Sequence, residues 1–315
     1  MGFEALLGNQ QLKENLRASI RRGHIAHFYL ISGPAGSGKK TLARLLSAAI
    51  LCRGETTACM GCTACRKVMA DTHPDVITVV DPEHKNVAVK IVREIRDDMF
   101  VMPNEADRKI YIFPQDLGTE GQNALLKILE EPPSYGVFIL PSENPETLLP
   151  TVRSRCTQLQ MQSLSPEILE PALRREFPEA SSQDLKAALW RSGGFLGQAK
   201  LFLEEGAQLS EQTENFLRSF AQKDALGLVR VLAPMEKWKR DQVIPLLQQW
   251  VQLLQQALAC RSGAAAVSEA AADLAARRSP KDLLLAIRQL QKAIEYAQQN
   301  VSPAAVCGWL TWALR

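Results

Sequence analysis

A glycine-rich segment near the amino terminus has the residue types and spacing of a phosphate-binding loop. It reads Gly-Pro-Ala-Gly-Ser-Gly-Lys over residues 33–39 and follows an apolar run at residues 28–31. In such a loop, backbone N–H groups surround a phosphate and the following helix adds its partial positive charge. The lysine reaches the outer phosphates. The pattern therefore predicts a nucleotide-binding loop composed of Gly33, Gly36, Gly38, Lys39, Lys40 and Thr41.

The groups that would let this loop hydrolyse a nucleotide are missing. Lys40 stands where a Ser or Thr hydroxyl would bind magnesium, and Thr41 points about 100° away along the helix. Pro114 and Gln115 stand where a magnesium-binding Asp and a second acid are expected after a strand. Phosphoryl transfer needs a held metal and an oriented water. We expect weak or absent binding of ATP or ADP and no hydrolysis; the alternative is another register, in which Asp116 matters.

Four of the seven cysteines crowd into one short stretch, at Cys52, Cys59, Cys62 and Cys65. Structural zinc takes four ligands in a tetrahedron, and Cys-x2-Cys spacing supplies two at once. Gly61 suits a tight knuckle between them. The stretch therefore predicts a closed, structural zinc site, with redox cysteines or an iron–sulfur cluster as the alternatives. His73 is expected to be an ordinary loop residue.

The first half of the chain alternates apolar, strand-like runs with amphipathic, helix-like stretches. This alternation is typical of a parallel sheet with helices on its faces. The expected strands are residues 28–32, 75–80, 109–113, 137–141 and 157–161. The expected helices are residues 41–51, 89–99, 119–131 and 147–152.

Strand signals end near residue 163, and the remainder of the chain is expected to be helical. Apolar residues at helical spacing predict long helices around residues 243–258 and 283–294, and the Ala-rich stretch 264–276 also favours helix. Asn300-Val301-Ser302-Pro303 predicts a cap with Pro in the first turn of a last helix. We expect three domains: an α/β domain at 1–162 with its cysteine module at 52–65, a small helical lid domain at 163–206, and a helical domain at 207–315.

Composition favours a globular protein without a membrane segment. The chain has 315 residues, 46% hydrophobic and 23% charged, and a net charge of +3. This near-balance does not predict a large basic surface for nucleic acid. The amino-terminal residues lack the pattern of a signal peptide, and no apolar run approaches the roughly 20 residues of a membrane helix. A cytoplasmic location is expected.

Several motifs together resemble one known family. They are the opening segment 3–43 with His27, the cysteine module, the helix Gln122–Lys127 leading to Glu130-Glu131-Pro132-Pro133, and Asn144-Pro145 followed by the segment 148–156, which ends in Ser-Arg-Cys. This set resembles the bacterial clamp-loader subunits of the AAA+ class, most of all their delta-prime group. The similarity is dense over residues 2–162. It implies an AAA+ α/β domain, a lid and a helical collar.

The resemblance also gives Arg155 a role that the residues alone would not. An arginine in a loop is usually a solvated charge, but in this family the Ser-Arg-Cys arginine points at the ATP of a neighbouring subunit. Arg155 would then be a catalytic arginine finger acting in trans. The family's sensor arginine is missing from residues 194–199, and Ser142, at a second sensor position, is expected to be structural.

The implied partners are the delta and gamma/tau subunits of the DNA polymerase III clamp loader, and through the complex a sliding clamp and primed DNA. Two other functions remain open. One is an active AAA+ ATPase of the gamma/tau type. The other is a zinc-knuckle protein that binds nucleic acid, although only Arg53, Arg66 and Lys67 lie near the cysteines and no aromatic residue does.

Overall fold

The computed structural model describes residues 2–54, 57–204, 210–262, 269–299 and 301–314. The chain divides into two compact units. The first contains Met1–Leu173 and Ser192–Ala199, and the second contains Arg174–Arg191 and Lys200–Arg315. The three-domain boundaries expected above stay a prediction.

The first unit is built on a five-stranded parallel sheet. The strand order is β2-β3-β4-β1-β5, so the chain passes from β1 to the edge strand β2, returns through β3 and β4, and adds β5 on the other side of β1. The strands are β1 (Phe28–Ser32), β2 (Val76–Thr78), β3 (Lys109–Ile112), β4 (Gly136–Ser142) and β5 (Thr157–Gln160). The expected α/β class with a parallel sheet is confirmed, and β2 is shorter than expected.

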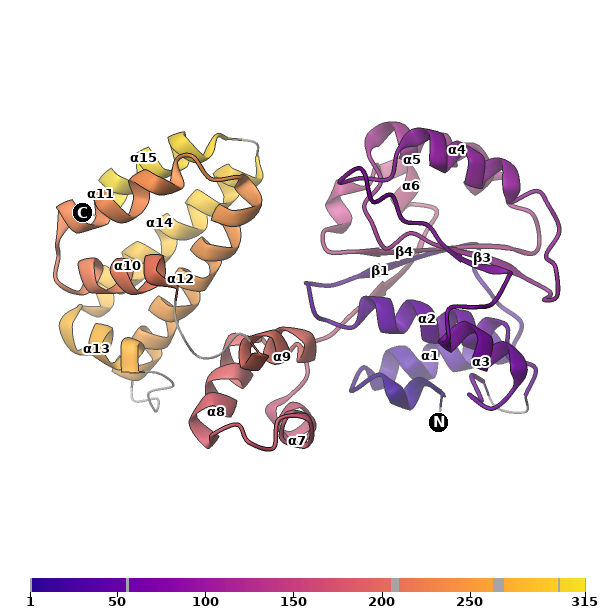
Figure 1. The fold of residues 1–315 in the computed structure, drawn as a ribbon, viewed down its shortest axis with the longest axis horizontal. Coiled ribbons are helices and arrows are strands. Elements are labelled where there is room, and N and C mark those ends of the chain that lie inside the picture. Colours follow the sequence, from indigo (N-terminus) through magenta and orange to yellow (C-terminus); the bar gives the residue numbers. More distant parts are fainter. Residues whose placement is uncertain (1, 55–56, 205–209, 263–268, 300, 315) are drawn as a thin grey trace. The chain divides into compact units, whose positions relative to one another are not determined.

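Helices cover both faces of this sheet (Figure 1). They are η1 (Gly2–Ala5), α1 (Gln10–Arg21), α2 (Lys39–Ile50), α3 (Thr63–Met69), α4 (Val89–Asp98), α5 (Thr119–Glu130), η2 (Pro145–Thr147) and α6 (Pro150–Arg153). Figure 1 shows α1, α2 and α3 on one face and α4, α5 and α6 on the other. The sequence did not predict η1, α1 or α3. The helix expected at 147–152 is wrong, because extended backbone at Leu148 and Leu149 separates η2 from α6.

Side-chain alternation along the central strands fills two cores. In β1, Phe28 and Leu30 face the core under α4 and α5, while Tyr29 and Ile31 face the core over α2. Residues two apart share a face of a strand, so a continuous apolar run is required when both faces are buried. This burial fixes the carboxyl end of β1, where the glycine-rich loop begins.

The rest of the chain is helical. Its helices are α7 (Pro166–Glu176), α8 (Ser182–Arg191), α9 (Leu196–Glu204), α10 (Glu211–Ala221), α11 (Ala225–Met235), α12 (Arg240–Arg261), α13 (Glu269–Arg277), α14 (Pro280–Gln298) and α15 (Pro303–Ala313). Both predicted long helices are confirmed as α12 and α14. The Ala-rich stretch is helical in α13, and its residues 264–268 lie outside the described residues.

The helical unit has its own core, centred on Trp250 of α12. The Trp250 ring is fully buried and stacks on Phe216 with ring centroids 3.9 Å apart, and its indole N–H donates to the Thr213 hydroxyl at 3.2 Å. At α15, Ser302 accepts from the backbone N–H of Ala305 and Pro303 occupies the first turn, as the sequence predicted. Across the described helices, none has the length and hydropathy needed to cross a membrane.

Candidate functional site

The glycine-rich loop joins β1 to α2, as expected for a phosphate-binding loop. Gly36 and Gly38 have φ values of 70° and 91°, a left-handed backbone that favours glycine. Lys39 begins α2, and Lys40 and Thr41 are exposed in its first turn. The structure therefore brings the predicted loop residues together at the carboxyl edge of the sheet.

The Lys39 side chain is turned back onto its own loop. Its ammonium donates to the carbonyls of Gly33 and Pro34, both at 2.7 Å, and lies 3.9 Å from a Glu143 carboxylate oxygen. Burial lowers the pKa of Lys39, and the charge of Glu143 opposes that shift. A bound phosphate would therefore have to replace these carbonyl contacts.

The start of α9 packs directly against the loop. The Gly197 N–H donates to the Gly36 carbonyl at 2.9 Å, and the Gln198 side-chain amide donates to the Ala35 carbonyl at 3.1 Å. A Cβ on Gly36 would lie 2.5 Å from the Gln198 nitrogen, and one on Gly197 would lie 2.6 Å from the Gly36 Cα. Two glycines thus permit a close backbone contact between the loop and the start of α9.

A hollow of about 730 Å³ lies beside the loop. Its lining includes Ser32, Gly33, Pro34, Glu143, Met161 and Phe195. Its volume falls within the roughly 300–1,000 Å³ that is common for small-molecule sites. The hollow therefore has the size of a small-molecule site, and the Lys39 ammonium is bonded to the carbonyls of two of its lining residues, Gly33 and Pro34.

Gln115, at the position where a catalytic acid is usual, forms hydrogen bonds with the backbone of the loop that follows β2. Its side-chain nitrogen donates to the carbonyls of Asp81 at 3.1 Å, Lys85 at 2.8 Å and His84, and its oxygen accepts from the Asp81 N–H at 2.9 Å. These bonds hold the loop between β2 and α4 against the end of β3. Pro114 has no polar side-chain atom, and both ends of the Gln115 side-chain amide are already hydrogen-bonded.

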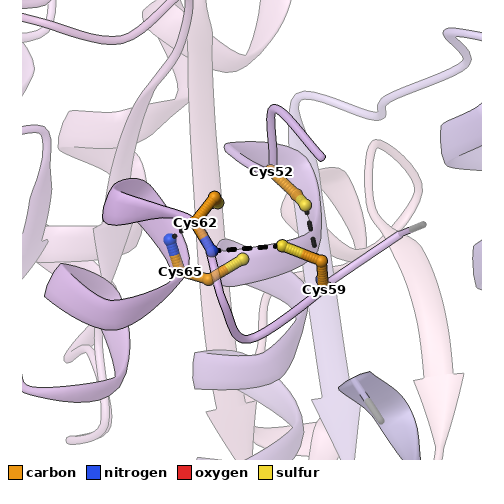
Figure 2. Close-up of side chains that lie close together, drawn as sticks. All are labelled: Cys52, Cys59, Cys62 and Cys65. Carbon is orange, nitrogen blue, oxygen red and sulfur yellow. Dashed lines mark hydrogen bonds between the residues drawn. The ribbon is translucent and has the colours of Figure 1, made fainter. Parts of the chain in front are cut away.

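The four clustered cysteines converge, as Figure 2 shows. Their sulfur atoms all lie within 4.8 Å of one another. Tetrahedral zinc with bonds of about 2.3 Å places its sulfurs about 3.8 Å apart, so small movements would close the site. The cluster at Cys52, Cys59, Cys62 and Cys65 could therefore hold a metal ion.

The backbone around the cysteines supports ionised sulfur. The N–H groups of Cys59, Cys62 and Cys65 each point at the sulfur of another cysteine of the cluster, at 3.3–3.4 Å. Burial disfavours the Cys62 thiolate, but N–H donors, with that of Cys65 first, outweigh it and lower the pKa of Cys62 to about 6. Burial raises the pKa of the Cys65 thiol, so a cation is needed to ionise it. This donor set suits a thiophilic cation such as zinc.

The knuckle is strained in a way that the sequence did not suggest. Ala58 and Met60, on either side of Cys59, have φ values of 56° and 59°. Non-glycine residues adopt this conformation at some cost, which the surroundings must offset. Gly61 is not among the residues with positive φ, so the left-handed positions of the knuckle are Ala58 and Met60.

Arg155 lies at the amino-terminal ends of the parallel strands, whereas the glycine-rich loop lies at their carboxyl ends. It precedes β5, whose Thr157 pairs with Tyr29 near the start of β1, whereas the loop follows Ser32 at the end of β1. Roughly 13 Å of strand separates the two edges. Arg155 donates to the Thr151 carbonyl at 2.9 Å and pairs with a Glu130 carboxylate oxygen at 3.0 Å, with its side chain 38% exposed.

Comparison with known proteins identifies a family for this chain. Residues 8–165, about half of the chain, match the family model described as "DNA polymerase III, delta subunit". The chain belongs to this family. The delta' subunit of Pseudomonas aeruginosa DNA polymerase III is 36% identical over 179 residues, which are 55% of this chain and 54% of that protein. The gamma/tau subunit of Mycobacterium tuberculosis is 35% identical over 178 residues, which are 55% of this chain and 31% of that protein.

In both comparisons the aligned region covers less than two-thirds of the relative's own length. Among solved structures, a "gamma subunit-related protein" of DNA polymerase III from Thermotoga maritima is 18% identical, covers 97% of this chain and 98% of that one, and has a TM-score of 0.48.

Proposed function

We propose that this chain is a delta-prime-like subunit of a cytoplasmic DNA polymerase III clamp loader. It does not hydrolyse ATP itself, and it gives Arg155 to the ATP of a neighbouring subunit. The position of Arg155 carries this proposal: it is exposed at the sheet edge away from its own glycine-rich loop. An arginine placed there is suited to a phosphate bound by another chain, which it can grip in a fork.

The state of the glycine-rich loop supports a subunit without turnover. Lys39 is engaged by loop carbonyls, and Gln115 is engaged by the loop that follows β2. With Lys40 exposed where a hydroxyl would bind magnesium, no described group of the loop is arranged to hold the metal. ATP or ADP would bind weakly or not at all.

The proposed partners are delta and gamma/tau subunits, and the complex would open a sliding clamp and load it onto primed DNA. Family membership and the similarity to gamma/tau and delta' subunits support this assignment. The helical C-terminal domain, with a core of its own, would form the part of the collar that holds the subunits together.

The cysteine cluster would hold one structural zinc ion. The four sulfurs lie close enough, and four protein ligands leave no open coordination position for catalysis. The ion would fix the 52–65 module on the first unit.

The isolated chain is expected to have no ATPase activity, and Lys39→Ala should leave that result unchanged. The reason is the lack of a magnesium ligand and of an acid at 40, 114 and 115. Phosphate release from ATP by the purified chain, with and without clamp and primed DNA, is the measurement. A turnover that Lys39→Ala abolishes would show that the chain is a motor.

An active ATPase remains the second candidate because of Asp116. This residue is exposed, and its carboxylate is close enough to Lys39 to act on that ammonium. If the chain hydrolyses ATP, Asp116→Asn should abolish the activity while Gln115→Ala reduces it less.

A further inference from the structure

A short apolar segment after α4 is held in an exposed position. Phe100, Val101 and Met102 are consecutive and are 56%, 58% and 67% exposed. Apolar side chains stabilise a fold when they are buried, so these three exposed side chains contribute little free energy that would hold them in place. Their position must therefore be maintained by other contacts of the segment.

The first of these contacts is a buried carboxylate beneath the segment. Asp75, which is fully buried, accepts from the N–H groups of Asn104 at 2.5 Å, Glu105 at 2.9 Å and Ala106 at 2.9 Å. Burial disfavours its charge, but these backbone donors outweigh the burial and lower the pKa of Asp75. Three successive amides are thus fastened to one side chain.

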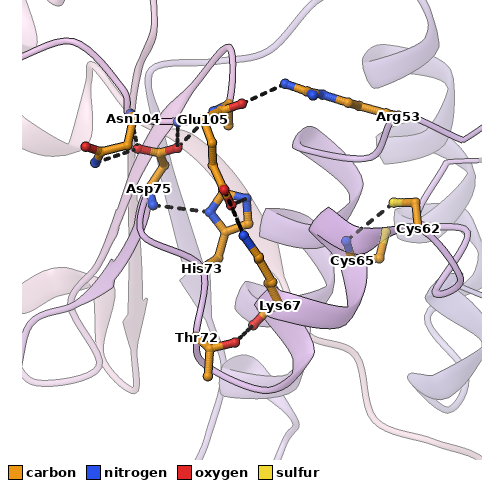
Figure 3. A network of polar contacts seen from close by, with 10 residues as sticks. Arg53, Cys62, Cys65, Lys67, Thr72, His73, Asp75, Asn104 and Glu105 are labelled. Atoms are coloured by element: carbon orange, nitrogen blue, oxygen red, sulfur yellow. Dashed lines mark hydrogen bonds and ion pairs between the residues drawn. The ribbon is translucent and has the colours of Figure 1, made fainter.

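The second set of contacts comes from the cysteine module and meets at Glu105 (Figure 3). The Lys67 ammonium lies 2.7 Å from both carboxylate oxygens of Glu105, and the Arg53 guanidinium donates to the Glu105 backbone carbonyl at 2.7 Å. The His73 ring nitrogen Nε2 lies 3.6 Å from the same carboxylate. Glu105 is therefore held at its side chain and at its backbone.

The residues that hold Glu105 are placed by the metal ligands. Arg53 directly follows Cys52, and Lys67 is two residues after Cys65 on α3. The backbone N–H groups of Gly54 and Cys59 each lie 3.4 Å from the Cys52 sulfur. Metal binding and local folding are coupled in such modules.

We infer that the metal-bound cysteine module is a buttress for the exposed segment 100–106, acting through Arg53, Lys67 and Glu105. Metal loss would free Arg53 and Lys67 from their positions and release Glu105. The bonds from the Tyr135 hydroxyl to the Phe100 carbonyl and from the Lys109 ammonium to the Val101 carbonyl do not involve the module, so the loosening would be greatest from Met102 to Ala106. By linkage, Glu105 would in turn help the module to keep its metal. This inference rests on the metal occupancy proposed above.

Hydrogen–deuterium exchange of the full chain tests the inference. The amides of Asn104, Glu105 and Ala106 exchange only when their bonds to Asp75 open, so a peptide over 99–108 reports the segment. Zinc-loaded and chelated chain would be compared, with metal content measured. We expect chelation to speed exchange at least fivefold in peptides over 52–69 and 99–108, while α14 (Pro280–Gln298) is unchanged.

The outcomes separate the two proposals. If 52–69 responds to chelation and 99–108 does not, the buttress is wrong and the metal site stands. If the chain carries no metal and neither peptide responds, both are wrong.

A variant tests the link at Glu105 with the metal in place. Glu105→Gln keeps the size of the side chain but removes its charge, and should raise exchange at 99–108 and speed zinc loss to a chelator by at least threefold. Glu94→Gln on α4 is the matched control, because Glu94 is exposed and its carboxylate lies 4.0 Å from the Lys90 ammonium on the same helix. Equal behaviour of the two variants would overturn the inference.

Discussion

Replacing Arg155 with alanine is expected to reduce ATP hydrolysis at the neighbouring subunit's site by roughly 10³–10⁵-fold, the range known for arginine fingers. The guanidinium stabilises charge that develops on the transferring phosphate, and alanine offers nothing in its place. Steady-state ATPase and clamp loading would be measured with the complex reconstituted from delta, gamma/tau and this chain. Assembly should be unaffected, since the Arg155 side chain is partly exposed.

A neighbouring arginine provides the matched control for this experiment. Arg153 lies on α6, is also partly exposed and pairs with Glu146 within its own chain. Arg153→Ala changes the net charge equally and should leave the ATPase within about twofold, as surface changes normally do. Arg155→Lys should recover little, because an ammonium cannot form the forked contact. Normal ATPase in Arg155→Ala would reduce this chain to a scaffold.

The pairing of Arg155 with Glu130 sets a condition on that role. In the isolated chain the two side chains are 3.0 Å apart, so the guanidinium must leave Glu130, or share it, to reach a phosphate. Exposed pairs of this kind contribute only about 0–1 kcal/mol, which a phosphate can readily exceed. The ion pair would keep the Arg155 guanidinium at the surface, and a bound phosphate could still displace Glu130.

Loss of the metal is expected to have the largest effect on stability. A ligand at about 1,000 times its dissociation constant stabilises the folded state by about 4 kcal/mol. Cys62→Ser, or a strong chelator, should remove about one zinc per chain and lower the calorimetric melting temperature of the first unit. Without the ion, nothing would compensate for the free-energy cost of burying the Cys65 sulfur or of the strained backbone at Ala58 and Met60.

Cys156→Ser is the appropriate control for the metal experiment. Cys156 lies between α6 and β5, outside the cluster, and its sulfur contacts the Val152 carbonyl at 3.1 Å. Its replacement should keep the metal and cause a smaller loss of stability. A chain that contains no zinc as purified, and melts unchanged with Cys62→Ser, would contradict the structural zinc site.

The sequence predicted the three central strands well because they are buried on both faces. Such strands are continuous apolar runs, and β1 and β4 are buried along their whole length. The helix expected at 147–152 failed because Leu149 precedes Pro150, and a residue before proline is disfavoured in helical backbone. The helix α3 was missed because its seven residues are too few to show apolar periodicity.

The candidate site was predictable in its residue types but not in its contacts. Cysteine spacing alone indicated the convergence that the structure has at Cys52–Cys65. The engagement of Gln115, the contact of Gly36 with Gly197 and the pairing of Arg155 with Glu130 join residues far apart in the chain. No local pattern encodes such pairs, and the strand order that creates them is set by packing of the whole unit.

Trp250 lies in the core of the helical unit, and the placement of all the tryptophans in the second unit has a consequence for fluorescence measurements. All five tryptophans belong to the second unit, at positions 190, 238, 250, 309 and 312. Indole emission would therefore report only on that unit, and a chain whose metal module had unfolded could still show native fluorescence. Tyrosines 29, 111 and 135 are the intrinsic chromophores of the first unit, so a tryptophan introduced there would make the two halves optically distinguishable.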